Sequence, residues 1–444
     1  MITSELRLKV GVLDHQQQVR GAFNAVFTLP DGRPCQGAFV AVVKNGAVVL
    51  ESGNGEIRLS APVIHCRSAA AATFTLHDVI IGIAFHWERR ENQTFRGDLL
   101  LVARGDGTLA AINEISVEDY LASVISSEMS ATAPLELLRA HAITSRSWLV
   151  AMLEREQRQR RHGRSSAHTL TMPGELIRWY DREDHDLYDV CADDHCQRYQ
   201  GVTKIITPAA AAAVQDTAGV FLVYENEICD ARFSKACGGL SENFENAWED
   251  TPVPYLQCIA DARQPHPPLR SEAEAEQWIL SQPEAFCNTT DGRILQQILP
   301  SFDQETTDFF RWQVTYEREQ LEQILQKKSG LHFGVLHDLV PVQRGLSGRL
   351  VKLKIVGSAQ TLVVGKELEI RRWLSPSHLY SSAFIVRTER DRRGLPLRFT
   401  LHGAGWGHGV GLCQIGAAVM ALTGYRAEEI VQHYFRGAEL RKLY

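Results

Sequence analysis

Over the first 112 residues, short apolar runs alternate with glycine and aspartate, a pattern typical of β-strands joined by tight turns. The stretches RLKVGVL, FVAVVKN and ATFTLHDVIIGIAF are rich in valine, isoleucine, leucine and phenylalanine, which favour strands. We therefore predict a β-rich N-terminal region over residues 1–112.

From about residue 116 the apolar positions change to a helical spacing. The stretch PLELLRAHAITSRSWLVAMLEREQ predicts a long helix with an apolar inward face, and Pro134 is tolerated in its first turn. Just before it, LASVISSEMSATAP contains one carboxylate, Glu128, among small and apolar residues. The inward face is predicted to carry Leu135, Leu138, Ala142, Ser145 and Leu149.

The rest of the chain mixes both patterns. Strands are predicted to return over residues 202–260, helices over 270–330, a strand pair in GRLVKLKIVGSAQTLVVGKELEI and a last helix in RAEEIVQHYFRGAEL. This mixture predicts an α+β fold, in which a mixed α/β domain over residues 113–444 follows the β-rich region. A segment rich in cysteine and histidine near 155–200 and a peripheral helical segment near 270–335 are predicted as insertions.

Composition narrows the function classes. The chain has 444 residues and a net charge of -6, which argues against a general nucleic-acid binder, because neutralising phosphates needs a surplus of lysine and arginine. No run approaches the ~20 apolar residues of a membrane span, and no export signal is visible at the start of the sequence. The 9 cysteines are an odd number and scattered, which favours reduced thiols or a metal site over a disulfide framework.

One group of metal-ligand residues is compact in sequence. The stretch HDLYDVCADDHCQRY offers two imidazoles and two thiols, the ligand set of a tetrahedral zinc site. A disulfide between Cys191 and Cys196, or two inert thiols, remain alternatives. The four candidate ligands are His185, Cys191, His195 and Cys196.

The glycine-rich stretch HGAGWGHGVGLCQIGA has a backbone that can approach a ligand closely, with Trp406 available for stacking. It lacks the Gly-Lys-Ser/Thr of a phosphate-binding loop. A tight hairpin with a buried tryptophan is the alternative. A second stretch, ARFSKACGGLSENFENAW, is by itself typical of a hairpin turn.

Arg146 follows Glu128 by 18 residues, on the predicted long helix. This spacing alone leaves two interpretations, an exposed arginine or a partner of Glu128.

Taken together, SVISSEMSATAPLELLRAHAITSRSW, FSKACGGLSENFENAW, SGRLVKLKI and GAGWGHGVGLCQIGA resemble the stage II sporulation protein D family, also called the amidase enhancer family. The resemblance covers roughly residues 115–436. It implies a lytic transglycosylase, which cuts the bond between N-acetylmuramic acid and N-acetylglucosamine in peptide-stripped peptidoglycan strands and leaves 1,6-anhydro ends.

The resemblance also implies roles for single residues. Glu128 would be the catalytic acid and base, and the zinc would be structural, with no cofactor for catalysis. The small apolar neighbours of Glu128 would favour the protonated form that a general acid needs. The residues implied to contact the glycan are Arg146, Ser234, Lys235, Trp406, His408 and Gln414.

Two other functions stay open. One is a non-catalytic, glycan-binding enhancer whose partner is a cell-wall amidase. The other is a zinc-stabilised intracellular protein with a different substrate, because no export signal is visible. The resemblance favours a location in the cell envelope or periplasm.

Overall fold

The computed structural model describes residues 4–69, 71–83, 88–162, 169–179, 185–193 and 195–444. Its internal contacts divide the chain into two compact units. The first unit comprises Met1–Arg146, Arg182–Val220 and Lys442–Tyr444, and the second comprises Ser147–Asp181 and Phe221–Arg441. The boundary at residue 112 that the hydrophobic pattern suggested stays a prediction.

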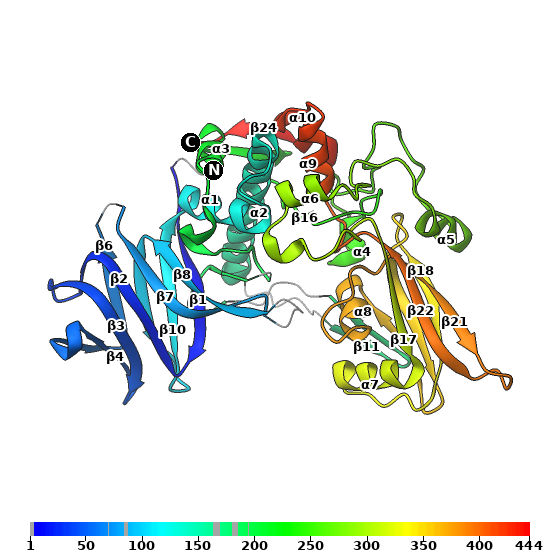
Figure 1. Cartoon of the computed structure of the whole chain (residues 1–444), viewed down its shortest axis with the longest axis horizontal. Helices are drawn as coiled ribbons and strands as arrows, with labels where there is room; N and C mark the ends of the chain where they lie inside the picture. Colours follow the sequence, from blue (N-terminus) through cyan, green and yellow to red (C-terminus); the bar gives the residue numbers. More distant parts are fainter. Residues whose placement is uncertain (1–3, 70, 84–87, 163–168, 180–184, 194) are drawn as a thin grey trace. The chain divides into compact units, whose positions relative to one another are not determined.

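The largest element of the first unit is an 11-stranded sheet, which lies mainly in the blue and cyan part of Figure 1. Alternate side chains of its strands point into the core, where Phe23, Phe27, Phe74 and Phe95 lie at most 1% exposed. The β-rich character predicted for the N-terminal region is therefore confirmed. The strands are β1 (Arg7–Gln16), β2 (Gln18–Thr28), β3 (Pro34–Lys44), β4 (Ala47–Ser52), β5 (Ile57–Ala61), β6 (Val63–Ser68), β7 (Thr73–Ile81), β8 (Arg89–Arg96), β9 (Asp98–Ala103), β10 (Leu109–Ser116) and β13 (Val190–Cys191), with a 3-10 turn η1 (Gly53–Gly55).

The sheet path runs β13-β1-β10-β9-β6-β2-β3-β4-β5, and β7 pairs with both β2 and β8. Most neighbours are antiparallel, but the short strand β13 joins β1 in parallel, with Gly11 opposite Cys191. The segment that carries the candidate zinc ligands is thus fixed to one end of the sheet.

Helices α1 (Val117–Glu128), α3 (Ala209–Asp216) and the start of α2 (Leu135–His162) complete the first unit, with the 3-10 turn η2 (Gly201–Lys204). The long helix predicted from the apolar spacing is confirmed as α2. Leu138, Ala142 and Leu149 are completely buried, whereas Leu135 is 37% exposed at the first turn.

The second unit contains several smaller sheets. A core that includes Leu350, Trp373 and Phe399 packs the five-stranded and one of the three-stranded sheets with helices α7 (Arg318–Ser329) and α8 (Glu367–Trp373). The five-stranded sheet has the order β11 (Thr169–Met172), β12 (Glu175–Arg178), β20 (Thr361–Gly365), β19 (Leu350–Gly357) and β18 (Leu336–Arg344). One three-stranded sheet contains β17 (Arg311–Glu317), β22 (Pro396–Ala404) and β21 (Phe384–Arg390), and the other contains β15 (Glu227–Ile228), β14 (Val220–Tyr224) and β24 (Glu439–Lys442). A two-stranded sheet pairs β16 (Phe233–Ser234) with β23 (Leu412–Cys413).

Apart from the rest of α2, the helices of the second unit in the described part of the chain are short. They are α4 (Phe244–Ala247), α5 (Glu272–Leu280), α6 (Gly292–Ile298), α7 (Arg318–Ser329), α8 (Glu367–Trp373), α9 (Gln414–Leu422) and α10 (Ala427–Tyr434), with the 3-10 turn η3 (Ser301–Asp303). The mixture of sheets and helices confirms the α+β class.

Two predicted segments differ from the structure. The segment near 270–335 is only partly helical, because β17 within it pairs with β22. Its alternating buried residues Trp312 and Tyr316 mark a strand beside a helical run. Residues 202–260 contain helices α3 and α4 as well as short strands. Of the predicted insertion near 155–200, residues 163–168, 180–184 and 194 lie outside the described residues.

No helix in the described part of the chain combines the length and the apolar character needed to cross a bilayer.

Candidate functional site

Glu128 is the last residue of α1, a helix with a well-formed start. The Ser116 hydroxyl accepts the Asp119 N–H at 3.3 Å, which is the usual N-cap arrangement. The helix ends where Met129 turns to an extended conformation. Glu128 is only 8% exposed, so its carboxyl group belongs to a semi-enclosed environment and not to an open surface.

Residues around Glu128 restrict the position of its carboxylate group. One oxygen, Oε1, accepts the backbone N–H of Arg198 at 3.0 Å. The hydroxyl groups of Ser126 and Ser127 instead donate to carbonyls of their own helix, four residues earlier. Val124 and Ile125, one turn back along the helix, are completely buried. The carboxyl group therefore has apolar side chains along the helix and a backbone donor from another segment.

The four candidate zinc ligands lie together in the first unit. Their donor atoms are all within 4.8 Å of one another. Cys196 Sγ lies 3.4 Å from His185 Nε2 and 3.5 Å from His195 Nδ1, and Cys191 Sγ lies 3.9 Å from the same Nδ1. Hydrogen bonds from Cys196 and then from the two imidazoles lower the pKa of the Cys191 thiol far below its usual value, against the effect of burial. The set can therefore provide thiolate ligands at neutral pH.

This cluster is joined to Glu128 through a short stretch of chain. Arg198, whose N–H binds the carboxylate, follows Cys196 by two residues. Between them the buried Gln197 donates to the Ser145 carbonyl at 3.3 Å and accepts the Tyr120 hydroxyl at 3.3 Å. The position of the cluster thus helps to set the position of the N–H that contacts Glu128.

Arg146 is completely buried. Its guanidinium forms a two-point ion pair with Glu118, at 3.0 and 2.6 Å, and its third nitrogen donates to the Val220 carbonyl at 3.1 Å. Glu118 also accepts the Gly219 N–H at 3.3 Å and the Tyr444 hydroxyl at 2.6 Å. A direct contact of Arg146 with glycan stays a prediction, and this geometry favours a structural role.

Ser234 and Lys235 lie in the second unit, at the end of β16. Phe233 and Ser234 of that strand pair in parallel with β23. The Lys235 ammonium forms an ion pair of 2.9 Å with Asp303, and both side chains are at least nine-tenths buried. The Ser234 hydroxyl is buried without a hydrogen-bond partner among the described residues, which is unusual for a buried polar group.

Trp406 lies among the glycines of the glycine-rich stretch, and Gln414 follows them. The Trp406 ring packs against Tyr380 and Phe309, with centroids 4.3 and 4.7 Å apart. Its backbone exchanges hydrogen bonds of 2.7 and 3.0 Å with Ala236. Gln414 begins α9 and is 2% exposed, whereas Trp406 is partly exposed. Of these two, Trp406 is better placed for stacking.

His408 is held as a neutral imidazole. Its Nδ1 accepts the Val410 N–H at 3.0 Å, so the ring proton lies on Nε2. Desolvation, followed by the charges of Arg232 and Arg349, keeps the pKa of His408 well below its usual value. Trp248 packs edge-on against the ring, with centroids 4.7 Å apart.

Arg349 packs against the glycine-rich stretch, and the sequence analysis did not indicate this role. It is 1% exposed and donates to the carbonyls of Gly407, at 3.2 and 3.3 Å, and Cys237, at 3.1 Å. A Cβ atom at Gly405 or Gly409 would lie 2.9 or 2.3 Å from its guanidinium, and both glycines have a φ of +75°. Packing around Arg349 therefore accounts for the glycine at position 409, whereas the Ala236 carbonyl, at 2.7 Å from such a Cβ atom, also restricts position 405.

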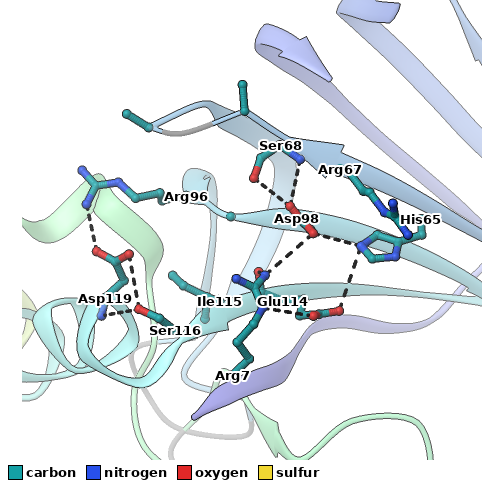
Figure 2. A pocket seen from close by; sticks show the side chains of 13 residues that line it. Arg7, His65, Arg67, Ser68, Arg96, Asp98, Glu114, Ile115, Ser116 and Asp119 are labelled. Carbon is teal, nitrogen blue, oxygen red and sulfur yellow. Dashed lines mark hydrogen bonds and ion pairs between the residues drawn. The ribbon is translucent and has the colours of Figure 1, made fainter. Parts of the chain in front are cut away.

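A separate cavity of about 540 Å³ opens at the other end of α1. Figure 2 shows Asp98 between Ser68 and His65, with Arg7 bound to Glu114. The positive and negative side chains that line this cavity largely neutralise one another. It reaches α1 at residue 119, nine residues before Glu128, or about 14 Å along a helix. We assign the cavity no part in the candidate site.

The candidate residues are divided between the two units. Glu128, Arg146 and the cluster of cysteines and histidines belong to the first unit, and Ser234, Lys235, Trp406, His408 and Gln414 belong to the second.

Comparisons with known proteins agree with the motifs. Residues 105–224 match the family model "Stage II sporulation protein", and residues 242–411 match a "Domain of unknown function (DUF8618)". The chain is 24% identical over 331 residues to stage II sporulation protein D of Bacillus amyloliquefaciens, covering 74% of this chain and 75% of that protein.

Two further relatives extend the comparison. Stage II sporulation protein D of Bacillus subtilis is 24% identical over 339 residues, covering 74% of this chain and 76% of that protein. An uncharacterized protein of Brachyspira hyodysenteriae is also 24% identical, over 78% of this chain and 72% of that protein. The motifs, the model matched over residues 105–224 and these relatives together support the similarity of this chain to the stage II sporulation protein D family.

Proposed function

We propose that this protein is a lytic transglycosylase that cleaves the N-acetylmuramic acid to N-acetylglucosamine bond of peptide-stripped peptidoglycan strands. The observation that carries the proposal is the placement of Glu128. This carboxyl group is 8% exposed at the end of α1, with one oxygen held by the Arg198 N–H. The names of the two Bacillus relatives support a sporulation-related role in the cell wall.

One carboxyl group is enough for this reaction. Ordinary glycosidases need two, one to protonate the leaving oxygen and one to act as nucleophile or activate water. In a lytic transglycosylase the C6 hydroxyl of the muramic acid attacks its own anomeric carbon. Glu128 would protonate the leaving oxygen and then accept the proton of that hydroxyl. Because the nucleophile is already part of the substrate, its effective concentration is high.

We also propose that the cluster His185, Cys191, His195 and Cys196 holds a structural zinc ion. In a tetrahedral site with Zn–S near 2.3 Å and Zn–N near 2.0 Å, neighbouring S and N atoms are about 3.5 Å apart. The three S–N distances of 3.4, 3.5 and 3.9 Å fit this value. Four protein ligands leave no open position for chemistry. The ion would fix the chain that leads to the Arg198 N–H.

The test is mass spectrometry of peptide-free glycan strands after incubation with the purified protein. We expect 1,6-anhydro ends with the unmutated chain and a rate about 10²–10⁴ lower with Glu128→Gln. Glu136→Gln is the matched control in the same unit, since Glu136 pairs with Arg139 on the first turn of α2. It should keep full activity.

Two results would refute the proposal. Cleavage by Glu128→Gln at the unmutated rate would exclude Glu128 as the acid. Glycan retained in a pull-down without anhydro ends would instead point to a binding protein that acts with an amidase.

A further inference from the structure

A second group of possible metal ligands lies buried in the second unit. Its four donor atoms lie within 4.8 Å of one another. Each of the three thiol residues is at most 2% exposed, and the carboxylate residue is completely buried. The members come from well-separated positions in the sequence: Cys237, Asp261, Cys287 and Cys413.

Backbone groups point at the sulfur atoms of this cluster. The Cys413 Sγ accepts the Cys237 N–H at 3.2 Å. The Cys237 Sγ accepts the Gly239 N–H at 3.4 Å, in a turn where Gly238 and Gly239 have φ values of +80° and +101°. Such N–H donors stabilise negative charge on sulfur, as the outer shell of a metal site does.

The carboxylate is held just as firmly. Asp261 Oδ2 accepts the Cys287 N–H at 3.0 Å, and Oδ1 accepts the Tyr434 hydroxyl at 2.6 Å. A Cβ atom at Gly416 would lie 2.4 Å from Oδ1. The helix α9 therefore leaves room for the carboxylate only because residue 416 is glycine. Both oxygens are oriented by hydrogen bonds, which fits a ligand whose outer shell is complete.

The distances suit one small cation. The Cys237 and Cys287 sulfur atoms are 3.7 Å apart, and two thiolates on a tetrahedral zinc ion are about 3.8 Å apart, given Zn–S bonds near 2.3 Å. A disulfide would need about 2.05 Å. It would also leave the Cys413 thiol and the buried Asp261 without a bound cation, and burying an ionised carboxylate without one is costly.

A positive charge lies close to the group. Arg311 donates to the carbonyl of Gly238, next to Cys237, at 3.0 Å, and its other hydrogen bonds among the described residues also go to backbone carbonyl oxygens. Within the described part of the chain it forms no ion pair with a carboxylate. Its charge can therefore offset part of the negative charge of three thiolates and one carboxylate.

We propose that Cys237, Asp261, Cys287 and Cys413 form a second, structural metal site for a divalent cation of the zinc type. The site joins the turn after β16, the loops around residues 261 and 287, and the start of α9. It has four protein ligands and is closed to solvent, so its role is to hold these four segments together. The inference does not depend on the activity proposed for Glu128.

The test uses the full chain with Cys191 and Cys196 both changed to serine, so that the first cluster cannot contribute. Elemental analysis of this protein, purified without added metal, is expected to find about one zinc ion per chain. X-ray absorption at the zinc edge should show three sulfur neighbours near 2.3 Å and one oxygen near 2.0 Å. Cobalt(II) exchanged into the site should give the visible bands of tetrahedral thiolate coordination.

Two variants in this background complete the test. Asp261→Asn is expected to lower the zinc affinity at least tenfold in competition with a chelator. Cys229→Ser, which removes another thiol that is 1% exposed in the same unit, should retain the full ion.

The proposal is overturned if the folded background protein contains far less than one ion per chain and takes up no cobalt. It is also overturned if mass spectrometry of the unreduced protein finds Cys237 and Cys287 joined as a disulfide. These measurements are made on protein with the second cluster intact, so they do not depend on whether a variant of that cluster folds.

Discussion

Replacing Arg146 by methionine separates a structural role from a glycan-binding role. The change removes a two-point ion pair, with Arg146 completely buried and Glu118 17% exposed. It also deprives the Val220 carbonyl of its donor. Breaking a buried pair from one side costs about 3–5 kcal/mol of unfolding free energy. For a unit of 150–250 residues, 1 kcal/mol shifts Tm by about 2–4 °C, so we expect Tm to fall by about 6–20 °C.

The assay is thermal and urea unfolding followed by circular dichroism, with a glycan pull-down beside it. Arg139→Met is the control, because Arg139 lies on the same helix in ion pairs with Glu136 and Asp216 but its side chain is 29% exposed. Exposed pairs contribute about 1 kcal/mol or less. If Arg146→Met unfolds at the same midpoint as the unmutated chain and loses only glycan binding, the structural reasoning is wrong.

Two further predictions concern the glycine-rich stretch. Gly409→Ala should lower the unfolding free energy by about 2 kcal/mol or more, because it adds a clash with Arg349 to the strain of a positive φ. The control is Gly394→Ala, where φ is +80° and the surrounding space is open, and it should lower the unfolding free energy by only about 1 kcal/mol. Equal losses in the two variants would contradict the role of Arg349. The folded pKa of His408 is depressed below the unfolded value of about 6.5, so its contribution to stability is complete above pH 6.5 and is lost as pH falls below it. Urea midpoints from pH 7.5 to 5 should therefore fall less steeply in His408→Gln than in the unmutated chain, and identical slopes would show that His408 does not titrate in this way.

Local patterns in the sequence were enough to predict some features. The helix α2 follows from a regular apolar spacing, and the first cluster follows from four ligand residues within a short stretch. Glu128 stood out because the residues around it are small or apolar, and the structure buries it at the end of α1.

Other features depend on contacts between distant residues, which one sequence does not reveal. Arg146 looked available for glycan because its partner, Glu118, lies 28 residues earlier with no local pattern joining the two. The second cluster was missed for the same reason, since Cys237 and Cys413 are 176 residues apart. The strand β17 was hidden because its alternation is short and adjoins the helical pattern of α7.

The packing of Arg349 against Gly405 and Gly409 has an evolutionary consequence. A side chain at position 409 can be accepted only after residue 349 has become smaller, because all three nearest atoms belong to Arg349. Positions 349 and 409 should therefore change together among relatives, whereas Gly405 is also held by the Ala236 carbonyl at 2.7 Å. Because Gly409 has a φ of +75°, asparagine is the first replacement to expect there once the space is free. A relative with asparagine at position 409 and arginine still at 349 would carry a differently folded loop.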